Sequence, residues 1–108
     1  MNKKQYEVFK RLREDDIPIY TDGVNDYTAK DIYKKKMPLI PESSIEPNWD
    51  LLQKRIEVKF DKGRLMTYYT MNGEVTPENQ VEEVKKRSAK GYEYMLQEHK
   101  LLEYILSR

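Results

Sequence analysis

The sequence predicts one α+β domain in which short helices and a β-hairpin precede a long C-terminal helix. Apolar residues recur at helical spacing in several segments, whereas residues 56–71 alternate apolar and polar side chains around a turn. The chain of 108 residues has the length of a single domain with one core. We expect the short elements within residues 1–75 and the long helix within residues 76–108.

The first element is expected to be a helix over residues 3–14, where Tyr6, Phe9 and Leu12 recur at helical spacing between charged residues. Pro18 prevents further helix, because its nitrogen carries no hydrogen for the helical hydrogen bond. An extended segment and a turn are expected to follow, over residues 17–20 and 21–26.

A second helix is expected over residues 29–36, because Thr28 followed by Asp31 resembles a capping box. The two prolines within residues 37–41 end this helix.

A third helix is expected over residues 45–54, with Ser44 as its N-cap. Pro47 then falls in the first helical turn, where its missing N–H had no intrahelical acceptor to lose. Trp49 shares a helical face with other apolar residues and is therefore expected in the core. These residues are Ile45, Leu52 and Ile56.

The alternating segment predicts a β-hairpin with strands over residues 56–60 and 65–71, joined by a turn over residues 61–64. Asn72-Gly73 is a strong turn dipeptide, so residues 74–75 are expected to add a brief third strand.

The last helix is expected over residues 76–106, with Thr76 as its cap and Pro77 at its first position. Its length would be roughly 46 Å, more than the roughly 34 Å width of a domain of this size, so we expect the helix either to bend or to protrude, with Gly91 as the place for a bend. Its apolar face exceeds what one small domain covers, which predicts a symmetric homodimer. The residues expected at the dimer contact are Tyr94, Met95, Leu101, Leu102 and Ile105.

The sequence contains no recognisable catalytic centre. It has no cysteine, which excludes disulfides, thiolate catalysis and cysteine-ligated zinc. Neither a glycine-rich phosphate loop nor a known nucleophile or zinc motif occurs. His99 is the only imidazole, and we expect it at an interface or partly buried rather than at a metal. We therefore expect no enzymatic activity, no metal and no cofactor.

Charge and hydropathy suggest a cytoplasmic protein with local binding sites. The formal net charge of +1 argues against nucleic-acid binding by bulk electrostatics, so any basic site must be local. No apolar segment has the length of a membrane span, and the N-terminal residues do not resemble a signal peptide.

Hydrogen-bond donors lie on three consecutive predicted elements: the end of the second helix, the end of the third helix and the hairpin turn. Such groups can contact phosphates and base edges, although lysines at a helix end are also explained by the helix dipole. The residues expected to contact DNA are Lys30, Lys34, Lys35, Asn48, Gln53, Lys54, Arg55, Lys59, Lys62 and Arg64.

The order of these elements resembles that of the winged helix-turn-helix superfamily. Residues 27–35 look like its capped second helix, residues 43–45 and 49–58 like its recognition helix, and residues 61–69 like the hairpin wing. The long terminal helix is similar to the dimerising helix of PadR-type repressors and of a bacterial replication terminator. The resemblance implies a third helix in the major groove and a wing on the DNA backbone.

Two functions remain open at this point. The first is a homodimeric regulator of transcription that binds double-stranded DNA, of the kind encoded by bacterial, bacteriophage or mobile-element genomes. The second is a protein–protein interaction factor, such as an inhibitor or adaptor of a host enzyme, that does not bind DNA. The near-zero net charge favours the second function.

Overall fold

The computed structural model describes residues 1–35, 37 and 47–107. These residues form five helices and two small antiparallel hairpins, which confirms the α+β class. Lys36 and residues 38–46, including Ser44, lie outside the described residues. The third helix nevertheless starts later than the predicted residue 45, at Trp49 with Asn48 as its N-cap, so Pro47 precedes it. In chain order the elements are α1 (Lys3–Arg11), β1 (Pro18–Thr21), β2 (Asp26–Thr28), α2 (Ala29–Lys34), α3 (Trp49–Asp61), β3 (Tyr68–Thr70), β4 (Gly73–Val75), α4 (Pro77–Lys86) and α5 (Ala89–Leu106).

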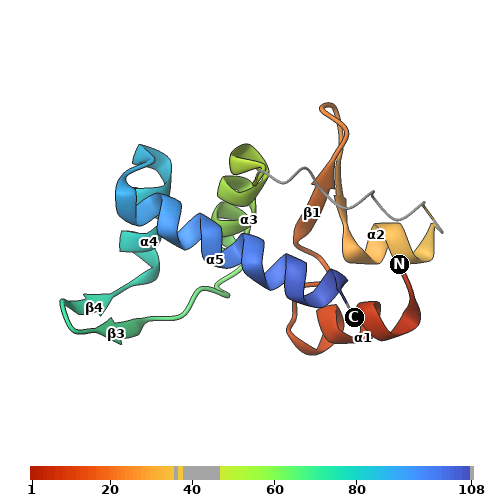
Figure 1. Ribbon diagram of the computed structural model, residues 1–108, viewed down its shortest axis with the longest axis horizontal. Coiled ribbons are helices and arrows are strands. Elements are labelled where there is room, and N and C mark those ends of the chain that lie inside the picture. The colour runs from red at the N-terminus through yellow and green to blue at the C-terminus, as the bar shows by residue number, and fades with distance from the viewer. Residues whose placement is uncertain (36, 38–46, 108) are drawn as a thin grey trace.

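The molecule is elongated, with principal extents of 43 × 26 × 23 Å. α1, α2 and the β1–β2 hairpin lie at one end, whereas α4 and the β3–β4 hairpin lie at the other (Figure 1). α5 runs between the two ends and packs against α1, α3 and α4. The helix α5 therefore joins the two halves of the structure.

The predicted first helix is confirmed as α1. Tyr6 and Phe9 on its inner face are buried, and the Tyr6 ring stacks on Tyr33 of α2 with centroids 4.2 Å apart. The helix ends at Arg11, slightly earlier than predicted, and Arg13 then adopts the left-handed conformation with φ of 57°.

The turn predicted after the first extended segment joins β1 to β2. Asp22 organises this turn, because its Oδ1 accepts hydrogen bonds from the N–H groups of Val24 and Asn25 at 2.8 and 2.6 Å. The Tyr27 hydroxyl donates to the other oxygen of the same carboxylate at 3.0 Å. The strand β2 was not predicted, because three residues are too few to show a clear alternation.

The predicted capping box of α2 is present. Thr28 Oγ1 accepts a hydrogen bond from the N–H of Asp31 at 3.1 Å, and Asp31 Oδ2 accepts from the N–H of Thr28 at 3.0 Å. The helix buries Ala29 and Ile32 and ends at Lys34.

The prediction of a strand over residues 56–60 is wrong, since these residues belong to α3. The inner face of α3 has helical spacing and consists of Leu52, Arg55, Ile56 and Lys59. Two of these four are cations, so the apolar residues by themselves show the period of a strand rather than of a helix. The predicted turn over residues 61–64 is likewise the C-terminal end of α3, with Lys62 as its C-cap.

The hairpin at Asn72-Gly73 is confirmed, and Gly73 has the positive φ of 117° that favours glycine. Its first strand is limited to Tyr68–Thr70 and its second is Gly73–Val75. This short β3–β4 hairpin, rather than a hairpin over residues 56–71, follows α3 in the chain.

The single long helix predicted over residues 76–106 is interrupted at Arg87, which takes left-handed angles of φ 51° and ψ 40°. Ser88 then caps α5, its Oγ accepting a hydrogen bond from the N–H of Gly91 at 3.1 Å. Gly91 does not bend a helix. It lets α5 approach α4 closely, because a Cβ at this position would lie 2.2 Å from the carbonyl oxygen of Glu83.

One core fills the space between the helices and the β1–β2 hairpin. Trp49 is only half-buried, packs against this core as expected, and makes an edge contact with Tyr92 at 4.9 Å between ring centroids. The fully buried apolar side chains include Phe9, Ile17, Leu52, Val84, Met95 and Ile105.

The close approach at Gly91 generates a prediction about stability. Replacing Gly91 with Ala should lower the free energy of unfolding by roughly 1 to 3 kcal/mol, because the added methyl group forces the backbones of α4 and α5 apart. Urea unfolding followed by circular dichroism measures the change. The neighbouring exposed change Lys90→Ala should stay within about 0.5 kcal/mol of the original protein. Equal stability of the two variants would contradict the close packing.

Candidate functional site

The cation predicted to contact DNA at position 55 is inside the protein. Arg55 is fully buried, and its Nη2 lies 3.2 Å from Glu14 Oε2 and 3.5 Å from Glu98 Oε2. Its Nη1 donates a hydrogen bond to the backbone oxygen of Pro18 at 2.8 Å. The prediction that Arg55 contacts DNA is therefore wrong, because its guanidinium is inaccessible to a phosphate.

Lys59 completes the same ion-pair cluster. Its Nζ lies 3.0 Å from Glu98 Oε2 and also pairs with Glu14, and its side chain is only 12% exposed. Two cations and two carboxylates thus neutralise one another between α3, α5 and the segment after α1. Glu98 could have been found in the sequence, because it falls at helical spacing between the buried Met95 and Leu102.

The remaining cations of this region are also paired with carboxylates. Lys54 pairs with Asp26, whereas Lys62 and Arg64 both pair with Asp16, at 3.0 Å from Lys62 Nζ to Asp16 Oδ2. Hydrogen bonding from Arg64 is the main reason that the pKa of Asp16 falls to about 2. These cations would have to leave their carboxylates before they could contact phosphates.

The two neutral residues predicted to read base edges are held within the chain. Asn48 is the N-cap of α3, its Oδ1 accepting a hydrogen bond from the N–H of Leu51 at 3.1 Å. Gln53 accepts a hydrogen bond from Arg87 Nε at 3.1 Å and donates to Glu57 at 3.3 Å. Neither amide points freely from α3 as a recognition residue would.

Three of the exposed predicted DNA contacts lie at α2, namely Lys30, Lys34 and Lys35, whereas the others, Asn48, Lys54 and Lys62, cap a helix or pair with a carboxylate. None of them forms an ion pair within the described residues, although the charges of Lys30 and Lys35 help to lower the pKa of Asp31, after its main cause, the hydrogen bond from Thr28. Five of the ten predicted DNA contacts therefore pair with carboxylates, and the α2 lysines are the exposed cations of this set that form no ion pair within the described residues.

The residues predicted at a dimer contact belong mainly to the core of a single chain. Met95, Leu102 and Ile105 are buried, and Tyr94 and Leu101 are half-buried against the same core. The break at Arg87 explains the difference, because it folds α5 back over α3 and α4 and covers the face that an uninterrupted helix would leave open. Most of the apolar face that motivated the homodimer is thereby covered, whereas Tyr92, Leu96 and Tyr104 of α5 stay exposed, and the homodimer stays a prediction.

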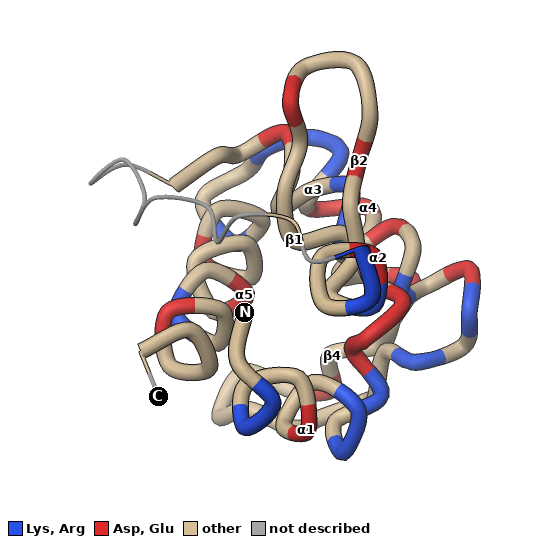
Figure 2. Tube along the Cα trace, turned by 90° about the vertical axis from the view of Figure 1, so that its right-hand side faces the viewer, with Lys and Arg blue, Asp and Glu red and all other residues tan. Residues whose placement is uncertain are grey.

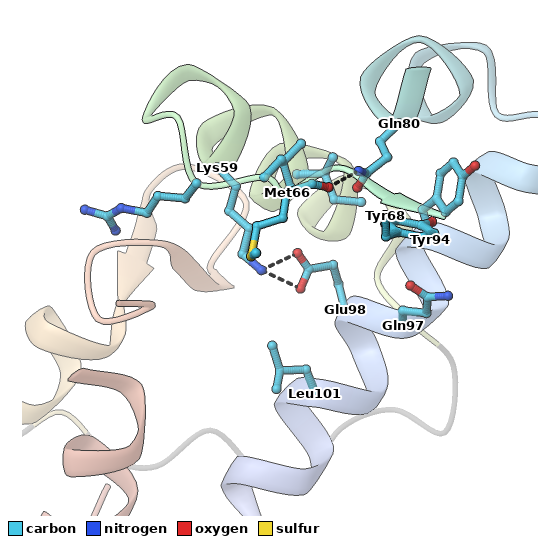
Figure 3. Close-up of a pocket in the computed structure, with 11 residues that line it drawn as sticks. Lys59, Met66, Tyr68, Gln80, Tyr94, Gln97, Glu98 and Leu101 are labelled. Carbon is cyan, nitrogen blue, oxygen red and sulfur yellow. Dashed lines mark hydrogen bonds and ion pairs between the residues drawn. The ribbon is translucent and has the colours of Figure 1, made fainter. Parts of the chain in front are cut away.

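An open cleft of about 300 Å³ lies between α3, the segment before β3, the start of α4 and α5. Lys59 points across it to Glu98, and Tyr68 lies edge-on to Tyr94 on the other side, with ring centroids 6.5 Å apart (Figure 3). Gln80 Nε2 donates to the backbone oxygen of Met66 at 3.0 Å, which fixes one wall. Burial is the main reason that the pKa of Tyr68 rises to about 12, so its hydroxyl stays protonated.

Beside the cleft, three large apolar side chains project into solvent. Met66 is 79% exposed, Tyr69 is 78% exposed and Met71 is fully exposed. We call these three residues the hairpin surface. All three lie in the strand predicted over residues 65–71, for which no role was expected. The frequent Met and Tyr residues of this segment could have indicated a contact surface.

The described residues contain no group of three or more His, Cys, Asp or Glu side chains able to hold a metal ion. His99 pairs with Glu103 one turn further along α5, with 2.8 Å between Nε2 and Oε1. None of the described helices is long and apolar enough to cross a membrane.

The buried cluster predicts a large asymmetry between two carboxylates of α5. Changing Glu98 to Gln should cost about 3–5 kcal/mol of unfolding free energy, because it leaves a buried positive charge without its partner. Changing the exposed Glu103 to Gln should cost less than about 1 kcal/mol. Chemical denaturation at pH 7 separates the two outcomes, and a similar small loss for both would refute the structural role of the cluster.

Asp16 should make stability depend on acid pH. Because its pKa in the folded protein is about 2, below the ordinary 3.8, its ion pairs stabilise the fold above pH 4 and are lost as the pH falls towards 2. Asp16→Asn should therefore lower stability at pH 7 by up to about 1 kcal/mol, a value limited by its partial exposure, and should match the original protein near pH 2. Thermal unfolding across this range tests the convergence. A constant difference at every pH would contradict it.

Comparison of the chain with family models, curated proteins and solved structures finds no match.

Proposed function

We propose that this protein is a non-catalytic protein–protein interaction factor that binds its partner through the hairpin surface and the adjoining cleft. The proposal rests on a difference between the cations expected to contact DNA and the exposed apolar side chains of the hairpin surface. Five cations of residues 54–64 are occupied by carboxylates of the same chain, whereas Met66, Tyr69 and Met71 contact almost nothing.

The chemistry of the hairpin surface fits a protein partner. Aromatic and methionine side chains are enriched at interface centres, where they bury much apolar area, and methionine adapts to irregular surfaces. Exposing three such residues within six positions is unfavourable in water unless a partner covers them. The cleft alongside offers a recess for a side chain of the partner, with polar groups from Tyr94 and Gln97 at its edge.

The pairing of the hairpin sets which side chains face outwards. Tyr69 lies opposite Glu74 and Tyr68 opposite Val75, so these two pairs occupy opposite faces of the hairpin. Tyr68 and Val75 are half-buried, whereas Tyr69 and Glu74 are exposed. An aromatic ring with a carboxylate beside it favours a partner surface that combines apolar and basic groups.

The strands of the hairpin also offer backbone groups. Neither β3 nor β4 pairs with a third strand among the described residues, so both outer edges can accept an extended segment of a partner. Pairing of this kind would place alternate side chains of that segment over Tyr69 or into the cleft.

The resemblance to winged helices is retained in this proposal as architecture rather than as DNA recognition. The order α2, α3 and β3–β4 corresponds to the two helices and the wing of that superfamily. A groove-reading role for α3 has little support, because its polar residues bond one another and its exposed Asp50 pairs with Arg87. Winged-helix folds serve more than one purpose, so the architecture alone does not favour DNA.

The interaction can be tested by affinity capture from the cell that makes the protein, with quantitative mass spectrometry. A triple change of Met66, Tyr69 and Met71 to Ser should reduce capture of the partner at least tenfold, because the centre of the interface is lost. These side chains are exposed, so the unfolding temperature should not fall.

The matched control removes exposed apolar groups elsewhere. Val24→Ser with Leu12→Ser should leave capture unchanged, since these residues lie on the β1–β2 turn and at the end of α1. Capture that survives the hairpin change, or that falls equally in the control, would rule out the hairpin surface. Sequence-specific DNA binding that depends on Gln53 and Lys54 would instead restore the regulator function.

A further inference from the structure

The solvent face of α1 is basic. The exposed charged positions of this helix are Lys3, Lys4, Glu7, Lys10 and Arg11. At 100° per residue they fall within a single arc of about 120°, opposite the buried face that carries Tyr6 and Phe9. Four cations and one carboxylate thus share one side of the helix, next to the basic end of α2.

Glu7 is the one carboxylate on this face, and several other carboxylates of the N-terminal segment pair with cations elsewhere. Glu14 lies in the buried cluster, Asp16 holds Lys62 and Arg64, and Asp26 holds Lys54. These acidic side chains of the N-terminal segment therefore neutralise the charges of cations in α3 and just after it, rather than those of α1. Figure 2 shows α1 with basic residues towards both of its ends and an acidic residue between them.

The stability of α1 does not explain its lysines. Lys3 and Lys4 occupy the first turn, where the helix dipole favours anions, and no acidic residue lies there. Lys10 and Arg11 are favourably placed in the last turn, and Lys10 also lies 5.7 Å from the centre of the Tyr6 ring. The charges of the first two lysines therefore do not stabilise the helix.

α2 packs beside α1 and carries further exposed lysines. The stacking of Tyr6 on Tyr33 places the two helices side by side, and Lys34 follows Tyr33 in the chain. Lys34 is exposed and forms no ion pair with the described residues. We define the basic surface as Lys3, Lys4, Lys10, Arg11 and Lys34.

From this segregation of charge we infer that the basic surface binds the phosphate backbone of double-stranded nucleic acid, independently of base sequence. This site differs from the groove-reading α3 expected from the sequence, and it is separate from the proposed protein-binding hairpin surface. Lys3 and Lys10 lie seven positions apart on α1, a distance of about 10 Å, so the two side chains can reach different phosphates of one duplex, which carries one phosphate per strand for about every 3.4 Å of its axis. A surface on which cations outnumber carboxylates suits phosphates, which carry no sequence information themselves.

The same surface suits other acidic partners less well. A protein interface needs apolar or aromatic groups at its centre, and the residues facing solvent on α1 are all charged. An interfacial membrane helix must insert an apolar face into the lipid, whereas the apolar face of α1 is packed against the core. A polyanion of high charge density remains the partner that this surface fits.

The test is a titration of the full-length protein with two unrelated random DNA duplexes between 50 and 200 mM salt, by fluorescence anisotropy. Both duplexes should bind equally, and four to five phosphate contacts should give a slope of log K against log salt of about −4. Lys3→Gln, Lys4→Gln, Arg11→Gln should reduce the magnitude of the slope by about 2 to 3 and weaken binding at least tenfold at the lowest salt.

The matched control is Lys85→Gln, Lys90→Gln, Lys100→Gln, which makes the same change in net charge at exposed residues of α4 and α5. It should keep most of the affinity and the slope. The charge-conserving pair Lys3→Arg, Lys4→Arg should also bind like the original protein. Circular dichroism should show all three variants folded, because the replaced side chains are exposed.

No binding to either duplex at 50 mM salt would overturn the inference, as would equal losses in the two triple variants. A strong preference for one duplex would also overturn it, because a backbone site cannot distinguish sequences. Binding to vesicles containing anionic lipid, with no binding to DNA, would also overturn the inference and would indicate that the basic surface binds membranes. None of these results depends on the hairpin surface, whose variant should bind DNA normally.

Discussion

The fold depends on the pairing of Arg55 and Lys59 with Glu14 and Glu98. Burying a charge without a partner costs several kcal/mol, so α3 can face inwards only if two carboxylates meet its cations there. Glu14 comes from the segment after α1 and Glu98 from the middle of α5. The cluster therefore fixes three separate parts of the chain relative to one another, and it requires α5 to be folded back over α3.

Local signals in the sequence predicted those elements that depend on local chemistry. Thr28 and Asp31 define the start of α2, and Asn72-Gly73 defines the turn between β3 and β4, because both features act through nearby backbone groups. The helix α3 was assigned incorrectly, since the buried cations Arg55 and Lys59 concealed its period. Helix boundaries that depend on tertiary contact are less visible in a pattern of apolar residues.

The break at Arg87 shows a second reason why the helices could not all be predicted from the sequence. Ser88 is an ordinary N-cap residue and could have indicated a new helix, yet the apolar stripe continues across it. The two packed helices are in close contact at Gly91 and Glu83, and the pattern of apolar residues does not show such a tertiary contact. The choice between one long helix and two packed helices decides whether Met95 and Ile105 form an interface or a core.

Candidate sites were harder to predict than elements, because the sequence gives the number of charges and not their partners. A formal net charge of +1 suggests a neutral surface, but neutrality is achieved by pairs that join distant segments. Each pair between α3 and the N-terminal segment removes one carboxylate that could have screened α1. The cations left on α1 are thus a consequence of how α3 is held.

The arrangement separates two chemically different surfaces. The basic surface lies on α1 and α2, at one end of a molecule 43 Å long, and the hairpin surface lies at the other end (Figure 1). Groups this far apart are separated by several Debye lengths at physiological salt, where one length is about 8 Å, so the charge of one surface has little effect on binding at the other. A partner at the hairpin can therefore be held without competition from a polyanion on α1. If both proposals hold, the rigid packing of α5 against α1, α3 and α4 would set the distance between a bound protein and a bound nucleic acid.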